Sequence, residues 1–123
     1  MKKIISTTLL FFFCINSYSQ NIITVSLKNK IESSQEDDFI PIIIEINNTL
    51  KLKDIKEEFD NNHIAIKKRA SILASRLQES ARFTQENVIN FIKNNSSKYK
   101  NLYPFWITNC IYVELTKDLI PNL

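Results

Sequence analysis

The most informative absence in this sequence is glycine, which does not occur once in 123 residues. Phosphate-binding loops, dinucleotide-binding turns, nucleophile elbows and EF-hand loops all need glycine, either for a positive φ or for close approach of the backbone. The sequence therefore excludes each of these motifs.

Histidine and cysteine are nearly as scarce. His63 is the only histidine, and a catalytic or metal-binding role would need a nucleophile, an acid or further ligands that no motif supplies. We interpret it as a polar residue at a helix start. Cys110, the only cysteine outside the N-terminal segment, could be a reactive thiol or pair between chains, but such a residue is more often a small buried hydrophobe. The sequence thus predicts no catalytic residue, no metal site and no cofactor, and we expect a protein that is not an enzyme.

The first twenty residues, MKKIISTTLLFFFCINSYSQ, have the layout of a secretory signal. Lys2 and Lys3 precede an apolar run that is shorter than the roughly 20 residues needed to span a bilayer. The small residues Ser17 and Ser19 predict cleavage after position 19. We therefore expect export to the periplasm or the extracellular space, without membrane attachment after cleavage.

Charge gives no sign of a polyanionic partner. Loss of Lys2 and Lys3 with the signal lowers the formal net charge from +3 to +1, so we predict neither nucleic acid nor an anionic membrane as partner. The basic residues 67–69 lie beside many carboxylates, and we interpret them as a solvated turn. The acidic residues between positions 54 and 60 lack the shaped loop that calcium prefers, and we interpret them as a solvated helix face.

Hydrophobic patterning predicts an exported domain over residues 39–123, preceded by a polar linker at residues 20–38 in which residues 22–28 are a candidate edge strand. FIPIIIEI, residues 39–46, is rich in β-branched side chains and nearly all apolar, which favours a central strand buried on both faces. A short helix or a turn follows in LKLKDIKEEFD. Apolar residues at helical spacing, beginning with Ile66, then predict a long helix over about residues 64–93, with Asn62 as its N-cap.

The stretch YPFWITNCIYVELT, residues 103–116, alternates as a strand does. One face, predicted to pack against the long helix, would carry Phe105, Ile107, Asn109, Ile111, Val113 and Leu115. The other would carry Trp106, Thr108, Cys110, Tyr112, Glu114 and Thr116. Large aromatic side chains with polar groups are typical of a surface that docks to a partner; burial within the domain, by residues 22–28, is the alternative. Thr116 is expected to cap a short final helix.

This order of elements predicts an α+β fold with helices on one face of an antiparallel sheet. It matches the split βαβ, ferredoxin-like plan as far as the second helix, with the final strand missing.

Three segments resemble the N-terminal propeptide of secreted subtilisin-like serine proteases: FIPIIIEI, KKRASILASRLQESARFTQENVINFI and FWITNCIYVELTKDLIPNL. In that family a helix with a Thr-Gln or Ser-Gln step precedes a segment resembling Trp-Ile-x-Asn-x-Ile-x-Val-x-x-Thr. Here the step is Thr84-Gln85, and the segment runs from Trp106 to Thr116. The resemblance covers roughly residues 39–123.

The resemblance implies a domain that assists the folding of its protease and blocks the active site until it is removed. In that family the propeptide sheet lies on helices of the catalytic domain, so the implied docking face here comprises Trp106, Thr108, Tyr112 and Glu114. The family continues into a final strand, an inhibitory tail and the catalytic domain, whereas this sequence ends after Pro121 interrupts the expected final helix. These departures predict a truncated precursor. A stand-alone secreted binding or structural module without a protease partner is the alternative.

Overall fold

The computed structural model describes residues 22–47 and 50–123, so the expected signal segment at residues 1–19 lies outside the described residues. The elements in chain order are α1 (Val25–Ser33), β1 (Phe39–Glu45), α2 (Leu52–Asn61), α3 (Ile66–Asn94), η1 (Ser96–Lys98), β2 (Tyr99–Phe105), β3 (Cys110–Thr116) and η2 (Ile120–Asn122). None of the helices in this part of the chain is long and apolar enough to cross a membrane.

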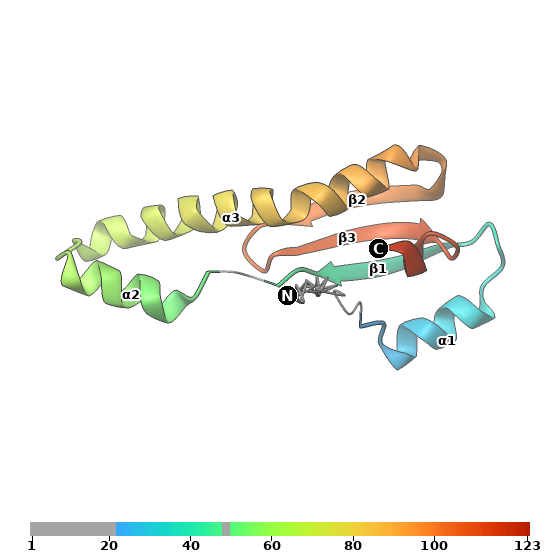
Figure 1. Cartoon of the computed structure of the whole chain (residues 1–123), viewed down its shortest axis with the longest axis horizontal. Helices are drawn as coiled ribbons and strands as arrows, with labels where there is room; N and C mark the ends of the chain where they lie inside the picture. The colour runs from blue at the N-terminus through green and yellow to red at the C-terminus, as the bar shows by residue number, and fades with distance from the viewer. Residues whose placement is uncertain (1–21, 48–49) are drawn as a thin grey trace, which may run out of the picture.

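The three strands form one antiparallel sheet in the order β1-β3-β2. Because both outer strands run antiparallel to β3, they are parallel to each other, and the chain between them crosses over through α2 and α3 (Figure 1). Insertion of β3 between two parallel strands is the split βαβ arrangement. The predicted α+β fold is confirmed, and the described residues contain three strands of the ferredoxin-like plan.

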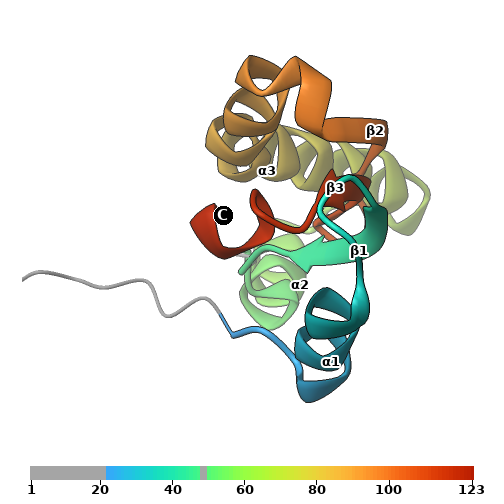
Figure 2. The same cartoon turned by 90° about the vertical axis from the view of Figure 1, so that its right-hand side faces the viewer.

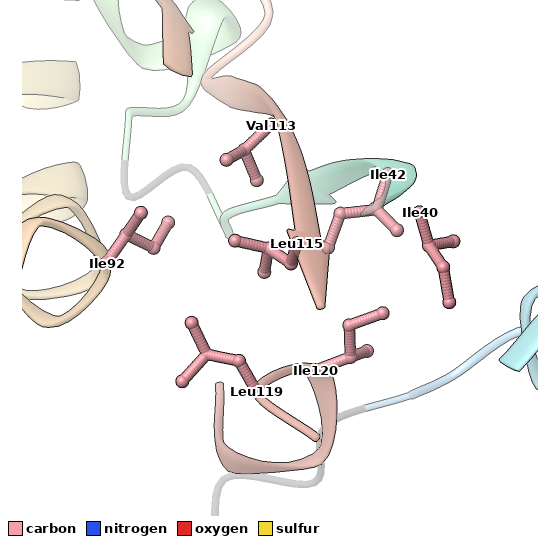
Figure 3. Packing of buried hydrophobic residues seen from close by; sticks show 7 residues of the cluster. All are labelled: Ile40, Ile42, Ile92, Val113, Leu115, Leu119 and Ile120. Atoms are coloured by element: carbon pink, nitrogen blue, oxygen red, sulfur yellow. The ribbon is translucent and has the colours of Figure 1, made fainter. Parts of the chain in front are cut away.

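The core lies between the sheet and the helices. Figure 3 shows side chains from β1, β3, α3 and the C-terminal segment converging on one centre. The buried members are Ile40, Ile42, Ile92, Val113, Leu115, Leu119 and Ile120. Alternate residues of β1 and β3 point to this centre, because successive side chains of a strand point to opposite faces of a sheet.

β1 differs from the prediction, because it buries one face and not two. Ile40 and Ile42 are buried, while Pro41 is exposed and Ile43 is 65% exposed. The strand order places β1 at an edge of the described sheet and not at its centre. Pro41 fits this position, since a residue without an N–H is tolerated on an edge strand.

The predicted continuous strand over residues 103–116 is a hairpin. Ile111, Val113 and Leu115 are fully buried as expected, but residues 106–109 form a turn between β2 and β3. Phe105 and Ile107, assigned to the core face from alternation, are therefore exposed. The turn ends at Asn109, which adopts the left-handed conformation with φ 49°, a conformation that Asn tolerates better than most residues.

Residues 22–28 do not form an edge strand, so that expectation is wrong. Thr24 caps α1 by accepting a hydrogen bond from the Leu27 N–H at 3.3 Å. Leu27 and Ile31, one helical turn apart, pack against the core. The cap and this pair favour a helix, which extends the folded unit upstream of Phe39 into the predicted linker.

The long helix is confirmed as α3, but its first turns have a different environment from the one predicted. Ile66, placed on the apolar stripe, is 84% exposed, because the N-terminal part of α3 extends beyond the sheet (Figure 1). Asn62 does not cap α3: it is the C-cap residue of α2, and Ala65 precedes α3 without a side-chain cap. The final helix is replaced by the short 3₁₀ turn η2, which accommodates Pro121.

His63 follows the C-cap of α2 and does not begin a helix. Its φ is 52°, its N–H donates to Asp60 O at 3.2 Å, and the Ile64 N–H donates to Phe59 O at 2.9 Å. These two bonds form a Schellman motif, which usually has glycine at the left-handed position. In a chain without glycine, histidine fills this position.

The acidic residues of α2 are more than a solvated face. Arg76 donates to both oxygens of Glu58 at 2.6 and 2.7 Å, and Arg69 pairs with Asp60 at 2.5 Å. The guanidinium groups of Arg69 and Arg76 also lie against the buried Phe59 ring, 5.8 and 5.6 Å from its centre, respectively. These contacts dock α2 on the part of α3 that projects from the sheet, so Arg69 is not part of a free basic patch.

Candidate docking surface

One face of the sheet carries no helix in the described part of the chain (Figure 2). We call it the outer sheet face, and define it by Pro41, Ile43, Lys100, Tyr103, Phe105, Cys110, Tyr112 and Glu114. Strand register places Ile43, Tyr112 and Tyr103 in one row across the three strands. Ile43, Tyr103 and Phe105 are 65%, 55% and 50% exposed. The face is therefore apolar and open over its middle.

The aromatic side chains of this face are ordered by contacts with one another. The rings of Tyr103 and Tyr112 stack with their centres 6.1 Å apart and an interplanar angle of 28°. Stacked rings of this kind present a rigid apolar surface, because few side-chain torsions remain to be fixed when a partner binds.

A polar network lies beside the aromatic row. Oε1 of Glu114 accepts hydrogen bonds from Asn101 Nδ2 at 2.9 Å and from the Tyr112 hydroxyl at 3.0 Å. The bond from Asn101, followed by that from Tyr112, holds the pKa of Glu114 below its ordinary value. The same carboxylate raises the pKa of Tyr112. The network keeps one negative charge fixed at the margin of an apolar surface.

The four residues of the implied docking face divide into two groups. Tyr112 and Glu114 lie together on the outer sheet face. Trp106 and Thr108 lie in the hairpin turn, where the Thr108 hydroxyl is 3.0 Å from the Cys110 sulfur. Trp106 is half-buried and lines a hollow beside α3. The structure therefore seals neither ring inside the molecule, but it does not place Trp106 and Tyr112 in one row.

Sequence reasoning missed Ile43, Tyr103 and Phe105, the most exposed apolar residues of the outer sheet face. Ile43 was placed in a strand buried on both sides, and Phe105 was assigned to the core. Pro41 could have predicted the position of β1 in the sheet, because proline within a strand indicates a sheet edge. If β1 is predicted as an edge strand with one exposed face, alternation places Ile43 on that exposed face.

The two motifs that carry the family resemblance contact each other directly. Gln85 Nε2 donates to Asn109 Oδ1 at 3.1 Å and to Phe105 O at 3.1 Å. The Thr84 hydroxyl lies 3.2 Å from the same Asn109 oxygen, and Asn109 Nδ2 donates to Ile46 O at 3.0 Å. We call Thr84, Gln85 and Asn109 the Gln85–Asn109 clamp. It ties the middle of α3 to the hairpin turn and to the end of β1.

A hollow of about 870 Å³ lies around the middle of α3. Its lining includes both Phe83 and Gln85, which lie on opposite sides of the helix because successive residues are about 100° apart. The hollow therefore wraps around α3 and does not form one enclosed site. In residues 22–47 and 50–123, no group of three or more His, Cys, Asp or Glu side chains could hold a metal ion.

No family model, curated protein or solved structure matches the chain. The relation to subtilisin-like propeptides thus rests on the resemblance of the motifs alone.

Proposed function

We propose that this chain is an exported, non-catalytic domain of the kind found as the propeptide of subtilisin-like serine protease precursors. It acts on the catalytic domain of a cognate protease, as folding chaperone and inhibitor, by docking through the outer sheet face. The proposed partner is that catalytic domain.

The observation that carries the proposal is the group of exposed apolar residues on the outer sheet face. Ile43, Tyr103 and Phe105 each keep at least half of their surface exposed on one face of one sheet. Single exposed apolar residues are common, but a contiguous group rimmed by polar side chains indicates a protein-interaction site. Aromatic residues are also enriched in the centres of interfaces.

The proposal has a second support in the Thr84-Gln85 step and the segment from Trp106 to Thr116. These two motifs carry the resemblance to the family, and they meet in the Gln85–Asn109 clamp. The two motifs supply the two sides of one hydrogen-bonded contact between α3 and the hairpin turn, which is a physical reason for them to occur together.

A refolding assay tests the proposal. A subtilisin-like catalytic domain without its propeptide is denatured and diluted into buffer with or without this chain at micromolar concentration. We expect the chain to raise the yield of active protease and to slow peptide hydrolysis by the folded enzyme. An unchanged yield together with unchanged hydrolysis, across several subtilisin-like proteases, would contradict the proposal.

Two variants with the same substitution locate the surface. Ile43→Asp places a carboxylate in the aromatic row and should weaken binding at least about tenfold, because a charge buried without a partner is costly. Ile66→Asp is the matched control, since Ile66 is also exposed but lies on the projecting part of α3. Equal effects of the two variants would show that the outer sheet face is not the docking surface. A chain that folds yet binds no subtilisin-like protease would instead favour a stand-alone secreted module.

A further inference from the structure

We propose that Gln85 is a positioning residue: its amide locks the hairpin turn between β2 and β3 and thereby fixes the shape of the outer sheet face. The turn comprises residues 106–109 and lies where the sheet meets the middle of α3. The inference concerns the free chain, and only its last experimental arm rests on the proposed function.

The hydrogen bonds of Gln85 reach both ends of the turn. The carbonyl of Phe105 belongs to the last residue of β2, and Asn109 immediately precedes β3. One side-chain amide donates to both, each at 3.1 Å. A single side-chain group thus bridges the two ends of the turn, in addition to the strand pairing of Phe105 with Cys110.

Two of the three clamp residues, Gln85 and Asn109, are buried, so water cannot easily replace the hydrogen bond between them. Gln85 and Asn109 are 3% and 2% exposed, and no buried side-chain nitrogen or oxygen of the described residues lacks a hydrogen-bond partner. Removing the Gln85 amide would leave the Phe105 carbonyl without this bond and Asn109 Oδ1 with Thr84 as its remaining donor. An unsatisfied buried group is costly, and the turn is the element free to move in response.

The position of the clamp separates it from the main core. None of its residues belongs to the buried apolar cluster around Ile92, Val113 and Leu115. The cluster holds α3 on the sheet, whereas the clamp acts on the turn. Phe105 belongs to the outer sheet face and Trp106 to the turn, so movement of the turn changes the surface offered to a partner.

Trp106 provides a local reporter, because it is the only tryptophan and lies in the turn. Gln85→Met keeps an unbranched side chain of similar length and removes both donors. We expect acrylamide to quench Trp106 fluorescence more strongly in this variant, and the backbone amides of the turn to exchange about tenfold faster. Helix content measured by circular dichroism should be unchanged. Gln78→Met, at an exposed position of α3, is the matched control.

A second pair of variants covers the case in which Gln85→Met does not fold. Asn109→Gly permits the left-handed conformation but removes the side chain of the clamp, and Asn101→Gly makes the same change at another left-handed residue, on the exposed part of β2. We expect Asn109→Gly to increase quenching of Trp106 and Asn101→Gly to leave it unchanged.

These measurements distinguish a clamp that positions the turn from a clamp that only adds to the global stability of the chain. If the clamp contributed to stability alone, Gln85→Met or Asn109→Gly would lower the thermal midpoint, while native-state quenching of Trp106 and exchange in the turn would stay at wild-type values. That result would overturn the inference. So would equal quenching in each variant and its control.

The arm that rests on the proposed function measures affinity for a subtilisin-like catalytic domain. A loosened turn should weaken binding of Gln85→Met about tenfold relative to Gln78→Met, since ordering of the turn must then accompany binding. Equal affinity of these two variants would overturn the link between the clamp and the docking face. If the wild-type chain binds no such protease, the proposed function fails, while the quenching and exchange data still decide whether the clamp locks the turn.

Discussion

At the scale of single residues, the absence of glycine is compensated by residues with polar side chains. The three described residues with positive φ are His63, Asn101 and Asn109, all near φ 50°. For asparagine this conformation is among the least unfavourable outside glycine, whereas histidine gains less from local hydrogen bonding. Among the described residues, His63 is therefore the position at which we expect the lack of glycine to cost most.

We predict that His63→Gly stabilises the chain by about 0.5 kcal/mol. Relief of the left-handed conformation is worth about 1–2 kcal/mol, and the greater freedom of glycine in the unfolded chain removes part of this gain. Urea denaturation provides the measurement. Asn62→Gly is the control: with φ −88° it gains no relief and should be neutral or destabilising. A loss of stability in His63→Gly would show that its side chain makes a contribution beyond the Schellman motif.

The pairing of Tyr112 with Glu114 gives a prediction for alkaline pH. The hydrogen bond to Glu114 is the main cause of the raised pKa of Tyr112, so the folded state is favoured below the ordinary tyrosine pKa and loses this contribution as pH rises through the folded pKa. Glu114→Gln should lower the pKa of Tyr112. Ultraviolet titration, with Tyr112→Phe used to identify the signal, measures the shift. An unchanged titration would mean that the bond does not persist in solution.

At the scale of elements, some predictions from the sequence succeeded because one strong periodic signal was present. α3 and β3 were found because their buried side chains, such as Ala81, Ile92 and Val113, recur at the helical or strand period. The turn at residues 106–109 was missed because alternation continued through it and asparagine, not glycine, marked its end. α1 was missed because isoleucine and valine suggested a strand, while Thr24 and the tertiary packing of Leu27 decided for a helix.

The docking of α2 on α3 depends on ion pairs, so we predict that it weakens in acid. Hydrogen bonds from Arg76 and Arg69 are the main causes of the lowered pKa values of Glu58 and Asp60. Their contribution is present above the ordinary carboxyl pKa and is lost as pH falls through the folded pKa values. Glu58→Gln should therefore reduce the acid-induced fall in the thermal midpoint, measured by circular dichroism.

Glu57→Gln serves as the control for this acid experiment. Glu57 lies 3.9 Å from Lys53 in a pair exposed on both sides, and such surface pairs contribute little. An acid-induced fall as large in Glu58→Gln as in the wild type would mean that the bidentate pair with Arg76 does not hold α2 in place.

At the scale of the whole molecule, the two sheet faces differ in what covers them. The inner face packs against α3, α1 and the C-terminal segment, including Leu119 and Ile120. No helix of the described residues covers the outer sheet face (Figure 2), and Ile43, Tyr103 and Phe105 are exposed on it. A covered and an uncovered sheet face were expected from alternation within β3. That Ile43 and Tyr103 also belong to the uncovered face could not be predicted without the strand order, because the residues of the row are far apart in sequence.

The most direct test of docking through the outer sheet face is backbone amide exchange of this chain, measured alone and with a subtilisin-like catalytic domain. We predict that binding slows exchange in β1 around Ile43 and in the β2–β3 hairpin around Tyr103 and Tyr112, while the projecting end of α3 near Ile66 stays unchanged. Slowed exchange confined to α2 and the projecting part of α3, or no change in any strand at saturating protease, would contradict the account.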